Sequence, residues 1–182
     1  MTRFEGDLAQ THQVIGAVQD RTGHPAEALA SYERARAILQ KLSDANPTLT
    51  LFQNRLAMSH AYVGLARQRG GRPAEAAVEF RQAVAIMERL SDLQPDGYDL
   101  YNLACFRSLL SGIADQRESG LTRDEAESLA EKAVETLRRA VAAGLQDVAF
   151  MRQDTDLDPL RSRADFQLLL LDLAFPEDPF EP

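Results

Sequence analysis

The sequence has 182 residues and a net charge of −8, with 45% hydrophobic and 26% charged residues and a single cysteine. These values are typical of one folded domain, and they exclude a disordered chain, a disulfide framework and a cysteine zinc cluster. The negative charge argues against nucleic acid as a partner, because nucleic-acid binding needs a basic surface. The polar N-terminus and the absence of a long apolar run predict no signal peptide, no membrane contact by this segment and a cytoplasmic location.

An internal repeat with a period of 48 residues dominates the first half of the chain. When residues 8–47 are aligned with residues 56–95, 17 of the 40 positions are identical. A third, degraded copy follows in the same register. We therefore divide a single domain into repeat units at 1–48, 49–96 and 97–144, the third with a loop insertion near 118–124, and a C-terminal cap with an acidic tail at 145–182.

Each unit is predicted to form two helices. Apolar residues recur at intervals of three and four, as in Phe4, Leu8, Ile15 and Val18, and then in Ala28, Tyr32, Ala35, Ile38 and Leu42. Gly23 and Pro25 separate the two helices, and Asn46-Pro47 ends the second. The expected fold is an all-α solenoid, an α-α superhelix of about three helical hairpins, closed by a capping helix over 164–173.

Two glycines at equivalent positions predict close helix packing. Gly16 and Gly64 lie in the middle of the predicted first helices, where glycine costs about 1 kcal/mol relative to alanine. We expect the two helices of each hairpin to approach closely there, with Ala28 and Ala76 in the facing positions of the second helix.

The repeat resembles the tetratricopeptide repeat (TPR), which has a small residue, Gly, Ala, an aromatic residue and Ala at offsets 0, 7, 19, 23 and 26. The pattern is carried by Ala9, Gly16, Ala28, Tyr32 and Ala35, and again by Ala57, Gly64, Ala76, Phe80 and Ala83. Two signature positions differ. The family's tryptophan position holds His12 and His60, and its tyrosine position in the first helix holds Gln19 and Arg67.

More specifically, the chain resembles the long-repeat TPR arrays at the C-terminus of bacterial serine/threonine protein kinases. The similar segments are Asn46-Pro47-Thr48, Ser59-His60, the run at 23–35, Tyr101-Asn102-Leu103-Ala104-Cys105, the run at 156–161 and Phe166-Gln167. The chain itself has no glycine-rich phosphate loop, His-Arg-Asp or Asp-Phe-Gly motif, so we predict no enzyme activity, no catalytic residue, no metal and no cofactor. The resemblance implies a non-catalytic protein-protein interaction module, a signalling scaffold or adaptor that forms the regulatory C-terminal region of such a kinase. The alternative is a structural spacer or self-association module without a peptide ligand.

In the TPR family the first helices of the repeats line a concave peptide groove. The resemblance implies that residues at the equivalent repeat positions of this chain line a similar groove. The corresponding positions are Gln10, Gln13, Val14, Ala17, Arg21, Met58, Ala61, Tyr62, Leu65, Arg69, Phe106, Leu109, Leu110, Ile113 and Arg117. The set is largely apolar with three arginines along one margin, which implies a protein or peptide partner with an apolar or amphipathic segment and acidic flanks. Alternatively, these side chains pack against neighbouring repeats or beneath the chain's own C-terminal tail. We also expect self-association through the exposed N-terminal hairpin.

Other polar residues are interpreted as structural. His12 and His60 lie one repeat apart, roughly 10 Å between packed helices, which is too far to share a metal ion. Asp154, Asp156 and Asp158 alternate as in a calcium loop, but Pro159 stands where that loop needs glycine, so we expect Asp158-Pro159 to start a short helix instead. Cys105 falls at a small-residue position, so we expect it to be buried.

Overall fold

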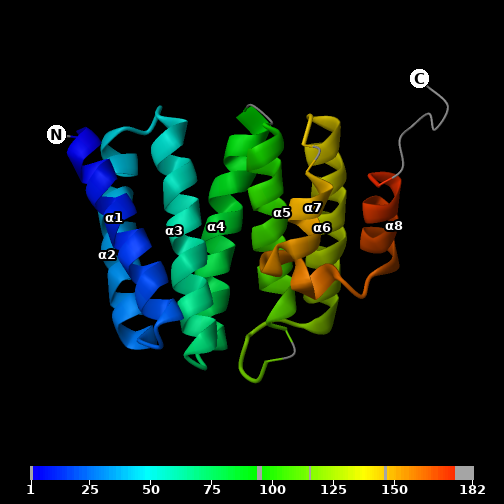
Figure 1. Ribbon diagram of the computed structural model, residues 1–182, viewed down its shortest axis with the longest axis horizontal. Coiled ribbons are helices and arrows are strands. Elements are labelled where there is room, and N and C mark those ends of the chain that lie inside the picture. The colour runs from blue at the N-terminus through cyan, green and yellow to red at the C-terminus, as the bar shows by residue number, and fades with distance from the viewer. Residues whose placement is uncertain (1, 94–95, 115, 146, 175–182) are drawn as a thin grey trace.

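The computed structural model describes residues 2–93, 96–114, 116–145 and 147–174 (Figure 1). Within these ranges the chain forms eight α-helices and one 3-10 helix and contains no strand, which confirms the predicted all-α class. The elements are α1 (Thr2–Arg21), α2 (Pro25–Ala45), α3 (Thr50–Arg69), α4 (Pro73–Leu93), α5 (Gly97–Gly112), α6 (Arg123–Ala142), α7 (Val148–Gln153), η1 (Thr155–Leu160) and α8 (Ala164–Asp172). In this part of the chain, none of the helices is long and apolar enough to cross a bilayer.

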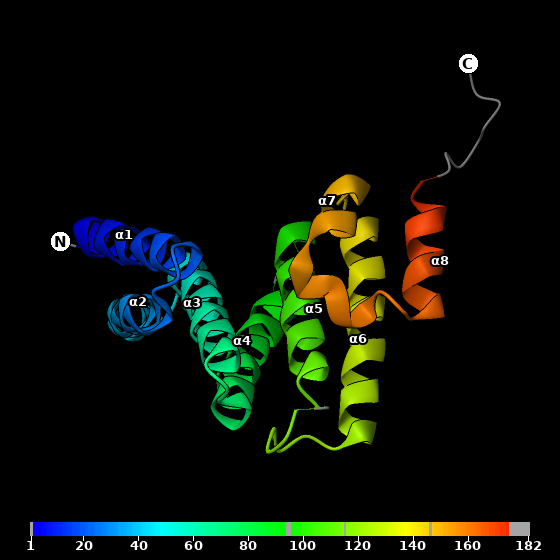
Figure 2. The same ribbon diagram turned by 60° about the horizontal axis from the view of Figure 1, so that its bottom comes forward.

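Consecutive helices pack as hairpins. α1 packs on α2, α3 on α4 and α5 on α6, and successive hairpins meet through α2 with α3 and α4 with α5. The hairpins therefore follow one another along the molecule, with α1 and α2 at one end and α8 at the other (Figures 1 and 2). This arrangement confirms the predicted helical-hairpin solenoid.

The turns of the first two hairpins have the same geometry. Gly23 has a φ of 82° and Gly71 a φ of 70°, a left-handed conformation that glycine adopts without strain. Pro25 and Pro73 then begin α2 and α4, where a backbone N–H would have no helical partner. The repeated Gly-x-Pro sequence thus sets the position of both turns.

In each of the first two hairpins, a glycine of the first helix makes room for an aromatic ring. A Cβ added to Gly16 would lie 2.7 Å from the ring of Tyr32, and one added to Gly64 would lie 2.6 Å from the ring of Phe80. Close packing was expected, but the nearest atoms belong to these rings and not to Ala28 and Ala76, which are themselves fully buried. The glycine and the aromatic residue therefore fix the spacing of the hairpin as a pair.

The third hairpin is less regular. α5 has 16 residues whereas α1 and α3 have 20 each, and residues 113–122 connect it to α6. The N-terminus of α6 has a capping box, in which Thr122 accepts from the backbone of Glu125 and the Glu125 carboxylate accepts from the backbone of Thr122. Arg117 lies in the connection and not on a helix.

The C-terminal segment covers the last hairpin. η1 packs on α5, and α6 contacts both η1 and α8. Leu157, Leu160 and Phe166 are fully buried and join the main hydrophobic core. α8 confirms the predicted capping helix, whereas α7 was not predicted; the end of the acidic tail, 175–182, lies outside the described residues.

Candidate partner-binding groove

A pocket of about 250 Å³ lies on the face of α1 and α3. Its lining residues are Gln10, Gln13, Val14, Ala17, Tyr32 and Tyr62. All but one of these occupy positions that the repeat phase assigned to a groove. The exception is Tyr32 of α2, which the sequence pattern assigned to hairpin packing. Its ring does both, because it packs on Gly16 and also reaches the pocket.

Two tyrosines form the aromatic wall of this pocket. The rings of Tyr32 and Tyr62 stack with centroids 5.5 Å apart and an interplanar angle of 20°. Burial raises the pKa of Tyr32, with Tyr62 adding to the effect and Arg21 opposing it. Burial also raises the pKa of Tyr62, and the charge of Asp156 adds to it. Both hydroxyls therefore stay protonated near neutral pH and can donate a hydrogen bond.

A second pocket, of about 420 Å³, lies further along α3, between α3, α5 and η1. Leu65, Arg69 and Leu109 from the predicted groove contribute to its lining. The opposite wall comes from η1 and includes Asp156 and Asp158. The sequence pattern gave no signal for this acidic wall, because it depends on the C-terminal segment folding back onto α5.

Most groove positions in the third unit belong to the core and not to an open surface. Phe106, Leu109, Leu110 and Ile113 are at most 6% exposed. Leu109, Leu110 and Ile113 cluster with Phe80 and other side chains of α4, while Phe106 belongs to the core that includes the C-terminal segment. In the third unit the structure thus matches the alternative interpretation, because neighbouring hairpins and the chain's own C-terminal segment pack around these positions.

In the second unit the assigned positions differ in accessibility. Ala61 is 3% exposed and lies in the main core, against which Met58 is also packed. Tyr62 and Leu65 are partly exposed and line the two pockets. The accessible groove is therefore formed by α1 together with Tyr62, Leu65 and Arg69 of α3.

The three arginines do not form one continuous row. Arg69 forms an ion pair with Asp20 of α1, which links the first two hairpins. Arg21 acts on the pKa of Tyr32 and so lies near the first pocket. Arg117 is in the loop after α5. The pocket beside η1 therefore contains Arg69 together with the carboxylates of Asp156 and Asp158.

The acidic wall is held in place by a partly buried hydrogen bond. The Tyr101 hydroxyl of α5 donates to Asp154 at 2.6 Å, and Asp154 also caps η1 by accepting from the backbone of Asp156 at 3.0 Å. The short helix therefore begins at Thr155, with Asp154 as its N-cap, and contains Pro159, which corrects the expected start at Asp158-Pro159. Cys105 is buried beside this contact as expected, and burial raises the pKa of its thiol.

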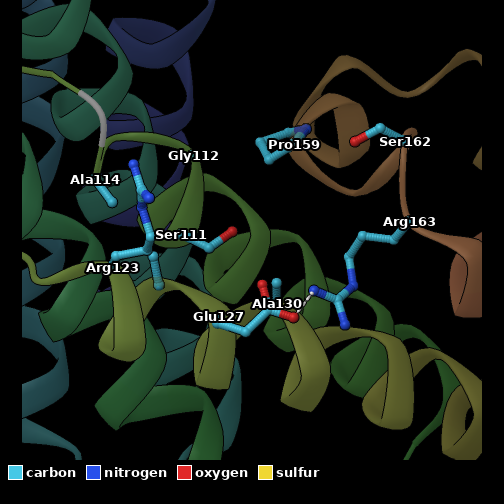
Figure 3. A pocket seen from close by; sticks show the side chains of 10 residues that line it. Ser111, Gly112, Ala114, Arg123, Glu127, Ala130, Pro159, Ser162 and Arg163 are labelled. Atoms are coloured by element: carbon cyan, nitrogen blue, oxygen red, sulfur yellow. Dashed lines mark hydrogen bonds and ion pairs between the residues drawn. The ribbon is translucent and has the colours of Figure 1, made fainter.

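A further pocket of about 470 Å³ lies where the cap meets α5 and α6 (Figure 3). Arg163 crosses it to pair with Glu127 at 2.6 Å, and it also pairs with Asp165 at 2.9 Å. Pro159 lies so near Gly112 that a Cβ there would be 2.5 Å from its ring. Because the arginine is already neutralised by two carboxylates, we assign this pocket to the attachment of the cap and not to ligand binding.

Sequence reasoning missed a buried ionic cluster between the hairpins. Glu79 of α4 is 4% exposed, and it contacts His60 at 2.6 Å, Arg67 at 2.9 Å and also Arg36 of the preceding hairpin. Burial by itself would raise the pKa of Glu79, but hydrogen bonds from His60 and Arg36, with their charges, outweigh it and hold that pKa below its usual value.

The first hairpin has a neutral version of the same contact. Ser31, at the position of Glu79, donates to Gln19 at 2.7 Å, and Gln19 occupies the position of Arg67. Gln19 and Arg67, which occupy equivalent repeat positions, therefore each make a polar contact across their own hairpin. In the described residues, His, Cys, Asp and Glu side chains form no group suited to a metal ion.

Comparison with known proteins gives no match to a protein-family model and no significant similarity to a curated protein. Inferences about function therefore depend on the repeat pattern and on the groove itself.

Proposed function

We propose that the chain is a non-catalytic protein-protein interaction module of the TPR type, which binds an apolar peptide segment in the groove on α1 and α3. The observation that carries this proposal is the pocket at Tyr32 and Tyr62, which is built from both hairpins and in which every lining residue except Tyr32 is at a position assigned by the repeat phase. A volume of about 250 Å³ is smaller than the roughly 300–1,000 Å³ of typical small-molecule sites, and it suits one large side chain. This size favours a peptide anchor over a metabolite.

The groove also indicates the chemistry of the peptide. Its apolar anchor contacts the stacked tyrosines and Val14, while Gln10 and Gln13 are available for hydrogen bonds with the peptide backbone. Acidic residues on one side of the anchor suit Arg21. Basic residues suit Asp156 and Asp158 of η1, so the expected ligand carries both acidic and basic residues beside its anchor and not acidic residues alone.

Selection of a random peptide library against the purified chain tests this proposal. We expect enriched peptides that share an apolar anchor with both acidic and basic residues beside it. Val14→Asp should weaken the binding of a synthetic copy of a selected peptide by at least about tenfold, since it places a charge in the apolar pocket. Val78→Asp is the matched control, because Val14 and Val78 are 58% and 52% exposed and only Val14 lines the pocket. Failure to enrich any peptide, or equal binding by both variants, would contradict the groove.

We further propose that this module is the regulatory C-terminal region of a bacterial serine/threonine kinase. The support is the resemblance of its motifs, among them Tyr101-Asn102-Leu103-Ala104-Cys105, to the arrays appended to such kinases. In this role the chain binds a substrate or regulator while a separate domain performs catalysis. A kinase catalytic domain in the same reading frame of the gene would support the proposal, and a frame without one would contradict it.

A further inference from the structure

A pocket of about 500 Å³ lies between α4 and α6 and shares no residue with the two pockets of the groove. Its apolar lining includes Val84 of α4, Leu110 of α5 and Leu129 of α6, together with Leu121 from the loop before α6. Val84 and Leu110 are buried, and Leu121 and Leu129 pack on the hydrophobic cluster that contains Leu110. The volume falls in the range of roughly 300–1,000 Å³ that is typical of small-molecule sites. The pocket therefore has the size and the apolar lining for a small ligand.

The internal repeat provides an equivalent place, between α2 and α4, with which this pocket can be compared. Positions in α4 follow those in α2 by 48 residues, and positions in α6 follow those in α4 by 57 because of the insertion. The second offset aligns Ala76, Phe80 and Ala83 with Ala133, Leu137 and Ala140. Each residue around the pocket can therefore be matched to a residue of the first interface.

At the first interface, ion pairs bridge this place. Arg67 of α3 pairs with Glu33 of α2 at 3.1 Å and with Glu75 of α4 at 3.6 Å, so two carboxylates from different hairpins converge on one cation. Arg36 crosses from α2 to Glu79 of α4 in the same interface. Side chains at the positions of Glu33 and Glu75 can therefore reach a common charged partner.

At the second interface the signs of these charges are reversed. Arg81 takes the place of Glu33, Lys132 takes that of Glu75, and both line the pocket. The place of Arg67 falls on residue 115, an alanine in the sequence that lies outside the described residues. Where two carboxylates hold a cation, two cations suit an anion, because binding sites present charges opposite to those of their ligands.

The second interface also lacks the arginine that crosses the first. Val84 takes the place of Arg36, and its short side chain leaves the space open. Within the described part of the chain, neither Arg81 nor Lys132 forms an ion pair. Arg81 donates a long hydrogen bond, of 3.5 Å, to the carbonyl of Gly120. Both cations are therefore available to a ligand.

The carboxylates that also line the pocket already have stabilising contacts. Glu88 pairs with Arg107 at 2.7 Å, and Glu125 accepts from the backbone and the hydroxyl of Thr122 at 2.8 and 2.9 Å. Asp124 lies in the first turn of α6, where the helix N-terminus stabilises a negative charge. The two cations are therefore the charged groups of the pocket that gain most from a ligand.

We propose that this pocket is a binding site for a small carboxylate with an apolar body. The carboxylate pairs with Arg81 and Lys132, and the body lies against Val84, Leu121 and Leu129. Leu121 belongs to the insertion near 118–124, so the segment that distinguishes the third unit also helps to build the site. The site uses α4 and α6, so it does not rest on the proposed peptide binding to α1 and α3.

Calorimetric titration of the purified chain with three probes tests the chemistry of the ligand. Decanoate, decanamide and decylammonium have similar alkyl chains and differ in charge. We expect decanoate to bind at one site, at least about fivefold more tightly than either of the other probes, because only its head group attracts the two cations.

Two pairs of variants locate the site. Ala85→Trp should weaken decanoate binding by at least about tenfold, because Ala85 lines the pocket and the indole would fill it. Ala37→Trp is the matched control, since Ala37 is the exposed alanine at the equivalent position of α2. Lys132→Gln should reduce the preference for decanoate over decanamide to about twofold or less. Lys41→Gln, at the only other lysine of the sequence, should leave that preference unchanged.

All of these variants should keep the helicity of the wild type, because the substituted side chains are exposed. Absence of decanoate binding, equal affinity for the three probes, or the same loss from Ala37→Trp as from Ala85→Trp would overturn the proposal. A preference for decanoate that persists in both Lys132→Gln and Arg81→Gln would show that these cations do not hold the carboxylate.

Discussion

The ring of Phe80 packs on Gly64 so closely that a methyl group added to the glycine would lie 2.6 Å from it. Tyr32 packs on Gly16 in the same way one repeat earlier. Each pair sets the distance between the helices of its hairpin, because the ring fills the space that the missing side chain leaves. The cost of a glycine inside a helix is thus offset by the packing of a large aromatic side chain.

Replacing Gly64 by alanine should therefore destabilise the protein. In an open helix this change would stabilise by up to about 1 kcal/mol, but here the new Cβ overpacks the hairpin and we expect a net loss of about 1–3 kcal/mol. Urea denaturation followed by circular dichroism gives the difference. The control is Gly6→Ala in α1, where the Cβ would lie 3.4 Å from the flexible end of Arg55, and stability should be unchanged or higher. Equal effects of the two substitutions would contradict the pairing with Phe80.

Removal of the Glu79 carboxylate should be far more costly than removal of an exposed one. Glu79→Ala leaves His60, Arg36 and Arg67 without their shared partner. We therefore expect the free energy of unfolding to fall by about 2–4 kcal/mol. Glu75→Ala, in the same helix, removes a side chain that is 48% exposed and should cost less than about 1 kcal/mol.

The Glu79 contribution should also depend on pH. Because the folded-state pKa of Glu79 lies below its ordinary value of 4.5, its contribution is present at neutral pH and is lost as the pH falls through the lowered pKa. The stability difference between the wild type and Glu79→Ala should therefore shrink in acid. A constant difference from pH 7 to the acid limit of folding would show that the carboxylate charge is not what stabilises the cluster.

Asp156 should show the opposite pH dependence. Burial and the neighbouring Asp154 charge, with a smaller contribution from Asp158 and against the effect of Arg69, raise its pKa from 3.8 to about 6. The folded state then holds the proton more tightly than the unfolded state, so this group reduces stability as the pH rises from about 4 to about 6.

Asp156→Asn should consequently be more stable than the wild type at pH 7, by up to about 3 kcal/mol, and equal to it near pH 4. Melting temperatures measured across this range give the comparison. Asp158→Asn is the control because Asp158 pairs with Arg161 at 2.7 Å, and its loss should slightly destabilise at pH 7. A pH-independent effect of Asp156→Asn would contradict the raised pKa.

The Tyr101 hydroxyl should hold η1 on α5. Tyr101→Phe keeps the ring beside Phe150 but removes the hydroxyl that donates to Asp154. We expect the free energy of unfolding to fall by about 1–3 kcal/mol. Amide hydrogen exchange should become faster in residues 154–160 in particular. Tyr98→Phe, at a residue that is 73% exposed, should change stability by less than about 0.5 kcal/mol. Unchanged exchange in η1 would show that apolar packing alone attaches the segment.

Sequence reasoning was strongest where the structure depends on local patterns. The helix bounds of the first two hairpins follow from apolar spacing, and their turns follow from Gly23-His24-Pro25 and its repeat, because turn geometry and helix starts are set by a few neighbouring residues. The positions that face the first pocket also follow from the repeat phase, since equivalent residues of a regular helix point in equivalent directions.

Tertiary packing decided which of these positions are accessible and which polar residues meet. Phe106 and Ile113 have the same phase as groove residues, yet they are buried because α4 and the C-terminal segment pack around α5. The Glu79 cluster joins residues of α2, α3 and α4 that no local pattern connects.

Where the net charge of −8 acts on the molecule also depends on the tertiary structure. Its excess of carboxylates falls mainly in residues 145–182, where the sequence shows only an acidic segment. The fold back onto α5 places Asp156 and Asp158 beside the groove. The sequence by itself determined the helices, their pairing and the directions of their faces, because those depend on periodicity along one chain. Only the tertiary structure decided which faces stay open, because burial depends on what packs against them from distant parts of the chain.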